Sequence, residues 1–113
     1  MPDCLFCAMA SGVVPAERLA ENDHAFAIRD ISPRAPTHVL IIPRTHIASA
    51  REIEWGHTEQ LGGMFVLANE VARLEGVSED GYRLAFNVGD AAGMTIDHLH
   101  LHLLGGRRLG PEG

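Results

Sequence analysis

The stretch His98-Leu99-His100-Leu101-His102-Leu103-Leu104 places three histidines in strict alternation with leucines. Side chains alternate between the two faces of an extended strand, so this pattern predicts a strand with all three imidazoles on one face. Neighbouring histidines then stand about 6.6 Å apart at Cα and the outer two about 13 Å apart. The outer two imidazoles therefore cannot bind one metal ion on a straight strand, whereas an adjacent pair can.

Three interpretations of this histidine row are open. A His-x-His pair can hold a catalytic zinc ion together with a third ligand from elsewhere in the chain. A row of imidazoles can also carry nucleophilic and acid–base chemistry without a metal, or it can simply line a solvated strand. Three histidines in register, backed by leucines and followed by Gly105-Gly106-Arg107-Arg108, favour a functional role.

Length and composition limit the class of protein. A chain of 113 residues fits one domain, residues 1–113, with a core of its own. No apolar run approaches the roughly 20 residues of a membrane span, so no membrane partner is expected. The start Met1-Pro2-Asp3-Cys4 lacks a basic region followed by an apolar one, which argues against a secretory signal and for a cytoplasmic protein.

The charge balance limits the partners. A net charge of −6 without a basic patch argues against a nucleic-acid partner, whose binding depends on neutralising many phosphates. A mononucleotide remains compatible, because one phosphate needs only a few donors. All nine Lys and Arg residues are arginines, which excludes lysine-based Schiff-base and phosphate chemistry.

Periodicity predicts the remaining elements. A short helix should end at Gly12, residues 18–21 and 24–28 should form a hairpin turning at Asn22-Asp23, and residues 37–42 and 82–88 should be strands. A helix is expected over residues 58–75, with Gly76 as its stop signal. Its apolar positions, widened by Leu67 and Leu74, cover about half of its circumference at 100° per residue. One sheet face rarely needs so wide a stripe, which indicates a second partner for this helix.

The histidine row resembles the signature His-φ-His-φ-His-φ-φ, with φ apolar, of the histidine triad (HIT) family. The likeness extends to residues 30–38, residues 42–47, Asn87, Gly93 and residues 105–107, which keep the family's order and spacing. The chain is most similar to the small purine-nucleoside-phosphoramidase branch. The resemblance implies an α+β fold: a five-stranded, mostly antiparallel sheet with one long helix and a short N-terminal helix. It also implies a homodimer with a continuous sheet.

Matching residues imply roles within the site. His100 would be the nucleophile that attacks the α-phosphorus of a purine nucleotide, with His102 and His38 donating to the phosphate or the leaving group. Residues of the implied nucleotide site are Phe26, Asp30, Ile31, Leu40, Asn87, Gly93, Met94, Thr95, His100 and His102. Two of them have simpler alternative interpretations. Phe26 could fill the core without contacting a ligand, and Asp30 could order its loop without binding a ribose.

Position 94 departs from the family pattern. Close relatives have glutamine where this chain has Met94, and a thioether is at best a weak hydrogen-bond acceptor. We therefore expect slow turnover with binding of AMP-like ligands retained.

The pair Cys4-Leu5-Phe6-Cys7 is either a redox couple or half of a zinc site. Members of the family that carry this pair complete a structural zinc site with two histidines, and the matching residues here are His46 and His98. The resemblance thus implies structural Zn²⁺ bound by Cys4, Cys7, His46 and His98, and no organic cofactor.

The function expected from the sequence is hydrolysis of purine nucleoside phosphoramidates or acyl-adenylates through a nucleotidyl-histidine intermediate. One alternative is a dinucleoside polyphosphate hydrolase or nucleotidyl transferase that uses the same site. Another is a purine-nucleotide-binding regulator with weak turnover.

Overall fold

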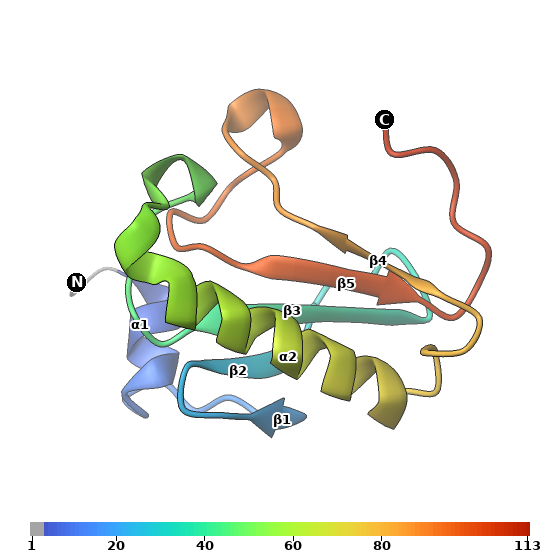
Figure 1. The fold of residues 1–113 in the computed structure, drawn as a ribbon, viewed down its shortest axis with the longest axis horizontal. Coiled ribbons are helices and arrows are strands. Elements are labelled where there is room, and N and C mark those ends of the chain that lie inside the picture. The colour runs from blue at the N-terminus through green and yellow to red at the C-terminus, as the bar shows by residue number, and fades with distance from the viewer. Residues whose placement is uncertain (1–3) are drawn as a thin grey trace.

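A computed structural model describes residues 4–113; Met1–Asp3, on which the expected absence of a secretory signal partly rests, lie outside the described residues. The helices and strands are α1 (Leu5–Ala10), β1 (Ala20–Glu21), β2 (Ala25–Arg29), β3 (Thr37–Pro43), α2 (Thr58–Leu74), β4 (Tyr82–Ala85) and β5 (Leu101–Gly105). The strands form one five-stranded sheet in the order β1-β2-β3-β5-β4, and every neighbouring pair is antiparallel (Figure 1). The predicted α+β fold is confirmed.

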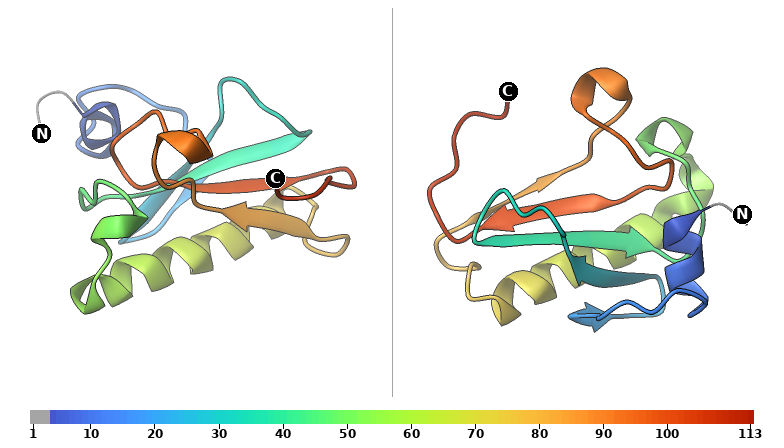
Figure 2. Two further views of the ribbon diagram at one scale, coloured as in Figure 1. Left: turned by 90° about the horizontal axis from the view of Figure 1, so that it is seen from above. Right: turned by 180° about the vertical axis from the view of Figure 1, so that it is seen from behind.

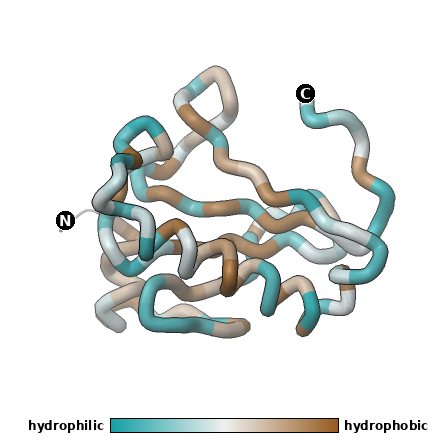
Figure 3. Tube along the Cα trace, viewed as in Figure 1, coloured by the Kyte–Doolittle hydropathy of each residue, from teal (hydrophilic) through white to brown (hydrophobic). Residues whose placement is uncertain are grey.

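Two layers cover the two faces of the sheet. The helix α2 lies across one face, while α1 and the loop before β5 lie over the other (Figure 2). β3 is buried along its whole length at the centre of the sheet. Hydrophobic residues recur along the central strands (Figure 3) and divide into two core clusters, one beneath α2 and one beneath α1. The second cluster lies beside the histidines, so the core under α1 also supports the site.

The helix α2 presents its apolar stripe to the sheet as expected. Its buried residues are Met64, Leu67, Ala68, Val71 and Ala72. Phe65, Val66 and Leu74 remain 40%, 63% and 63% exposed, so part of the wide stripe has no cover within the described chain. Within residues 4–113, no helix is both long and apolar enough to cross a membrane.

Three strands are shorter than predicted. β5 begins only at Leu101, so His98 and His100 precede it, because Pro43 ends β3 and has no N–H to extend the ladder. β4 ends at Ala85, which pairs with His102. Because β5 begins only one residue before His102, it offers β4 little further backbone to pair with. β1 is only Ala20–Glu21, and just before it the Arg18 guanidinium donates to the carbonyl of Met9 at 2.8 Å.

The hairpin before β2 turns where it was predicted. The Asn22 side-chain oxygen accepts hydrogen bonds from the amides of His24 and Ala25, both at 2.9 Å. The Asn22 side-chain nitrogen donates to the carbonyl of Gly63 on α2 at 3.0 Å. The turn is thereby fastened to the helix, and His24 packs directly over Gly63.

Gly63 should therefore tolerate no side chain. A Cβ built there lies 2.5 Å from the His24 Cβ, whereas one at neighbouring Gly62 meets nothing within 4 Å. We expect Gly63→Ala to lower the free energy of unfolding by about 1–3 kcal/mol through overpacking. Gly62→Ala should raise it by roughly 0.5–1 kcal/mol, because alanine favours helix. Urea unfolding of both variants checks this pair, and equal effects at the two glycines would contradict it.

Candidate active site

The register of three strands places the polar residues of the site on one face. Leu40 on β3 pairs with His102 on β5, and His102 pairs with Ala85 on β4. Residues two apart on a strand share a face, so His38 and Leu40 lie on the same side of the sheet as His102. This is the side that α1 covers (Figure 2). His38 and His102 are 2% and 7% exposed, so both imidazoles belong to the protein interior.

A cavity of about 450 Å³ opens on this face between α1, the loop after β2 and the loop before β5. Eight of the predicted nucleotide-site residues line it: Asp30, Ile31, Leu40, Asn87, Gly93, Thr95, His100 and His102. Phe26 and Met94 are not among the lining residues. Phe26 is fully buried, with the Arg18 guanidinium 4.7 Å from its ring centroid.

The hydrogen bond of His100 determines which of its nitrogens is free. Its Nδ1 lies 2.7 Å from the carbonyl oxygen of His98, and a carbonyl can only accept. The Nδ1 therefore carries a proton and donates it, which in the neutral imidazole leaves the lone pair on Nε2. Because His100 lines the cavity, it can present an unprotonated ring nitrogen to a ligand there.

A chain of hydrogen bonds sets the tautomers of the other two histidines. His38 Nδ1 accepts from the backbone N–H of Arg34 at 3.1 Å, so the proton of neutral His38 is on Nε2. That Nε2–H donates to His102 Nδ1 at 2.9 Å. Neutral His102 then carries its own proton on Nε2. The side-chain nitrogen of Asn87 lies 3.4 Å from this Nε2 and can only donate, so the Asn87 amide must turn its oxygen toward the His102 N–H to accept from it. The site thus holds a lone pair on His100 and an N–H donor on His102, with ring centroids 5.1 Å apart.

Burial keeps these buried imidazoles neutral. Desolvation is the main cause that lowers the pKa of His102 to about 4, and the charges of His100, His38 and Arg34 act in the same direction. Burial also lowers the pKa of His38, where Asp30 opposes the shift and Arg34 adds to it. Both rings are therefore neutral in the ligand-free site, where each has one donor and one acceptor nitrogen.

Asp30 has two contacts in addition to lining the cavity. One carboxylate oxygen accepts from the backbone N–H of Ser32 at 2.8 Å, which orders the loop. The other lies 3.4 Å from His38 Nε2. The predicted role toward a ribose and the simpler role in ordering the loop are therefore compatible in this geometry.

A second cluster lies at the N-terminal end of α1. The side chains of Cys4, Cys7, His46 and His98 place one ligand atom each within 4.8 Å of one another. Neighbouring ligand atoms are 3.2–3.5 Å apart. A tetrahedral zinc ion with sulfur and nitrogen ligands needs edges of about 3.4 to 3.8 Å, so a small adjustment fits the ion.

The tautomer of His98 supports metal binding at this cluster. Its Nε2 lies 2.9 Å from the carbonyl of Pro43 and must donate, which leaves the Nδ1 lone pair directed at the two thiols. Burial lowers the pKa of His98, so the ring stays neutral as a ligand must. Burial and the neighbouring Cys4 raise the pKa of the Cys7 thiol, which favours the protonated thiol unless a cation compensates. Together the four residues could hold a metal ion.

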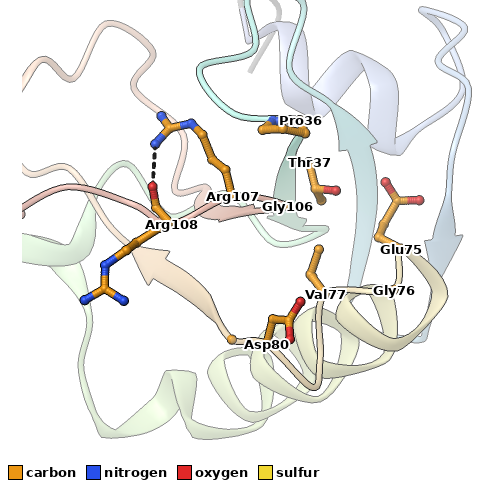
Figure 4. A pocket seen from close by; sticks show the side chains of 10 residues that line it. Pro36, Thr37, Glu75, Gly76, Val77, Asp80, Gly106, Arg107 and Arg108 are labelled. Carbon is orange, nitrogen blue, oxygen red and sulfur yellow. Dashed lines mark hydrogen bonds between the residues drawn. The ribbon is translucent and has the colours of Figure 1, made fainter.

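A larger cavity of about 590 Å³ lies at the opposite end of the sheet, beside the C-terminal end of α2. Its lining includes Glu75, Asp80, Arg107 and Arg108, with charges of both signs (Figure 4). Among the residues that the structure describes, its lining has no histidine or cysteine, so it lacks an imidazole that could activate the Thr37 hydroxyl. The chemistry therefore points to the smaller cavity beside His100.

Several lining residues were missed in the sequence. These are Leu5, Phe6 and Met9 of α1 together with Ile96, which form an apolar wall with Ile28, a residue that the family resemblance places near the base. Phe6 also packs edge-on against His98 and His100. The spacing of Leu5, Phe6 and Met9 on one helical face was the available signal. Arg34 also lines the cavity, but nothing in its local sequence indicated this.

Comparison with known proteins identifies the family of this chain. The family model of the HIT domain matches residues 11–109, so the chain belongs to the histidine triad (HIT) family. A relative in Escherichia coli (strain K12), named purine nucleoside phosphoramidase, is 41% identical over 109 residues. That match covers 96% of this chain and 92% of the relative.

Solved structures of the family share the fold. A HIT family hydrolase from Legionella pneumophila Philadelphia 1 is 46% identical with a TM-score of 0.93, covering 98% of this chain and 100% of that one. A Zn-bound histidine triad family protein from Mycobacterium smegmatis is 35% identical with a TM-score of 0.79, covering 94% of this chain and 76% of that one.

Stability should depend on pH through His102. Its folded pKa of about 4 lies below the ordinary value of 6.5, so the unfolded chain binds more protons between these pH values. The free energy of unfolding then rises with pH in this window and falls as the solution is acidified. We expect the wild type to lose about 2 kcal/mol more than His102→Gln between pH 7 and pH 5. Urea titrations at both pH values measure the difference, and parallel losses in the two proteins would refute this assignment.

Proposed function

We propose that this protein hydrolyses purine nucleoside 5′-phosphoramidates or acyl-adenylates through a covalent nucleotidyl-histidine. The observation that carries the proposal is the free Nε2 lone pair of His100, which is fixed by the bond from its Nδ1 to the His98 carbonyl and lies beside the N–H donor of His102. The name of the E. coli relative supports the same reaction class.

In the proposed first step, His100 Nε2 attacks the α-phosphorus. A phosphorus–nitrogen bond to the imidazole forms and the bond to the leaving amine breaks. The substrate phosphate beside His102 favours its imidazolium form, so a bound substrate recruits the proton that the departing amine needs. Backbone N–H groups around Thr95 would stabilise the negative charge that develops on the phosphoryl oxygens.

In the second step, water attacks the same phosphorus and releases the nucleoside monophosphate, which restores His100. The apolar wall of Phe6, Ile28 and Leu40 would hold the purine base, while Asp30 and Asn87 would contact the ribose or phosphate. The slow turnover expected from Met94 remains a prediction, and its side chain is not one of those that line the cavity.

We further propose that the Cys4, Cys7, His46 and His98 cluster binds a structural zinc ion. The mixed thiolate and imidazole donors suit tetrahedral Zn²⁺, and the His98 tautomer leaves its lone pair available. The Zn-bound relative from M. smegmatis supports this choice of metal. The ion would hold α1 against the histidine loop and take no part in phosphorus chemistry.

A homodimer is the third part of the proposal. β4 is an edge strand, and the exposed side chains of Phe65, Val66 and Leu74 lie on α2. The Phe65 ring stacks edge-on with Phe86, just beyond β4, at 6.2 Å between centroids. Pairing of two β4 edges about a two-fold axis would extend the sheet and cover these apolar side chains.

Substitution of His100 should separate chemistry from binding. We expect His100→Asn to abolish both turnover of adenosine 5′-phosphoramidate and the covalent adduct, while AMP still binds through the rest of the cavity. Intact-protein mass spectrometry after a rapid acid quench measures the adduct. Diadenosine tetraphosphate, assayed in parallel, tests the polyphosphate alternative. Near-wild-type turnover by His100→Asn would overturn the proposed nucleophile, and AMP binding with no turnover of any substrate would favour the regulator.

The zinc proposal predicts about one zinc ion per chain in protein purified without a histidine tag. Cys4→Ser should reduce the metal content and lower the melting temperature more than it lowers turnover, because the ion is structural. Elemental analysis with thiol titration provides the measurement. Metal content near zero with two freely reactive thiols would exclude the site.

The dimer proposal predicts a solution mass of about twice the 12.2 kDa of one chain. Val66→Glu would place a charge in the buried contact and should shift the protein toward monomer. Glu70→Gln is a suitable control, because Glu70 is also an exposed α2 residue. Multi-angle light scattering distinguishes these states, and a monomeric wild type at high concentration would refute the dimer.

A further inference from the structure

A second hollow adjoins the cavity on the side of His102 away from α1. It has a volume of about 270 Å³. Arg34, Asn87 and His102 line both this hollow and the 450 Å³ cavity that His100 lines. The strand register explains the shared wall, because Arg83 on β4 pairs with Leu104, two residues beyond His102 on the same face of β5. The two spaces therefore meet at His102.

Three arginines line this hollow: Arg34, Arg83 and Arg107. Arg107 is held by hydrogen bonds to the carbonyls of Arg34, at 2.9 Å, and Arg108, at 3.0 Å, the second of which is drawn in Figure 4. Arg83 donates to the carbonyl of Gly110 at 2.8 Å. Within residues 4–113, the Arg34 guanidinium has no hydrogen-bond or ion-pair partner, so its donors are available.

The local charge is opposite to that of the whole protein. The chain has a net charge of −6, yet among the described residues the only acid that lines the hollow is Glu112. The Glu112 carboxylate lies 3.8 Å from Arg83 and is 86% exposed, so it is a weak and displaceable partner. Its position also shows that a carboxylate in the hollow can approach Arg83.

Arg34 is also electrostatically coupled to the histidines. Its positive charge is among the causes that lower the pKa of both His38 and His102. Arg34 and His102 also line both spaces, so a ligand at their junction contacts the surroundings of both side chains. An anion bound beside Arg34 would therefore lie next to the group that is proposed to protonate the leaving amine.

We propose that this hollow is the leaving-group subsite and that it selects amines carrying a carboxylate, such as amino acids. The inference rests on the proposed function. In an in-line displacement the leaving group departs on the side opposite the attacking nitrogen. His100 precedes His102 in the chain and the hollow lies on the other side of His102 along β5, so the leaving group would depart toward the hollow. Planar guanidinium groups pair with carboxylates through charge-assisted hydrogen bonds, which neutral amines cannot match.

The test compares two substrates that differ in charge and hardly in size. These are the adenosine 5′-phosphoramidates of β-alanine and of its carboxamide. We expect the wild type to favour the acid by about tenfold in kcat/KM, as one charge-assisted pair allows. Arg34→Gln and Arg83→Gln should each lower this acid-to-amide ratio several-fold, and added salt should lower it in the wild type. Arg108→Gln is the matched control, because Arg108 is exposed and does not line the hollow.

The outcomes distinguish this inference from the proposed function. An acid-to-amide ratio of kcat/KM near one in the wild type, or a ratio that Arg34→Gln leaves unchanged, would overturn the proposed subsite. Turnover of the amide in the same assay would still support the proposed hydrolysis. If neither compound is turned over, the proposed phosphoramidate hydrolysis is wrong. Calorimetric binding of the two intact compounds then measures the preference for the acid directly. A higher kcat/KM for diadenosine tetraphosphate than for the β-alanine compound would overturn the amino-acid assignment in favour of a polyphosphate leaving group.

Discussion

One buried hydrogen bond, from His98 Nε2 to the carbonyl of Pro43 at 2.9 Å, determines much of the site. It fixes the tautomer of His98, so that Nδ1 offers its lone pair to the thiols of Cys4 and Cys7. It also holds the backbone of His98, whose carbonyl accepts from His100 Nδ1, so that neutral His100 has its lone pair on Nε2. A single proline carbonyl at the end of β3 therefore orients both the candidate metal ligand and the candidate nucleophile.

The sheet separates stability from chemistry. On one face, α2 buries an apolar core against β2 and β3 without polar groups from the site. On the other, the β3 and β5 register brings Leu40 beside His102 and leaves room for a cavity under α1. Because β3 is buried on both faces, movement of β3 would disturb both layers, which gives the histidines a rigid support.

Much of the fold and site could be predicted from the sequence, because their signals are local. Alternation identified the histidine strand and the 3.6-residue period identified α2, while matching motifs placed eight of the ten expected nucleotide-site residues around one cavity. The start of β5 was missed because it depends on the missing N–H of Pro43, a residue of another strand. The arginine hollow was missed for the same kind of reason, since Arg34, Arg83 and Arg107 meet only through the strand pairing of the folded sheet.

The short helix α1 connects the metal cluster to the nucleotide cavity. Six residues are far too few for an isolated helix to be stable in water, so tertiary contacts must hold it. Cys4 caps the helix by accepting from the amide of Cys7, and both thiols contact His98. From the same turn, Phe6 packs against His98 and His100 and lines the cavity. A metal ion bound by the thiols would thus act on nucleotide binding through Phe6, by fixing the wall that faces the base.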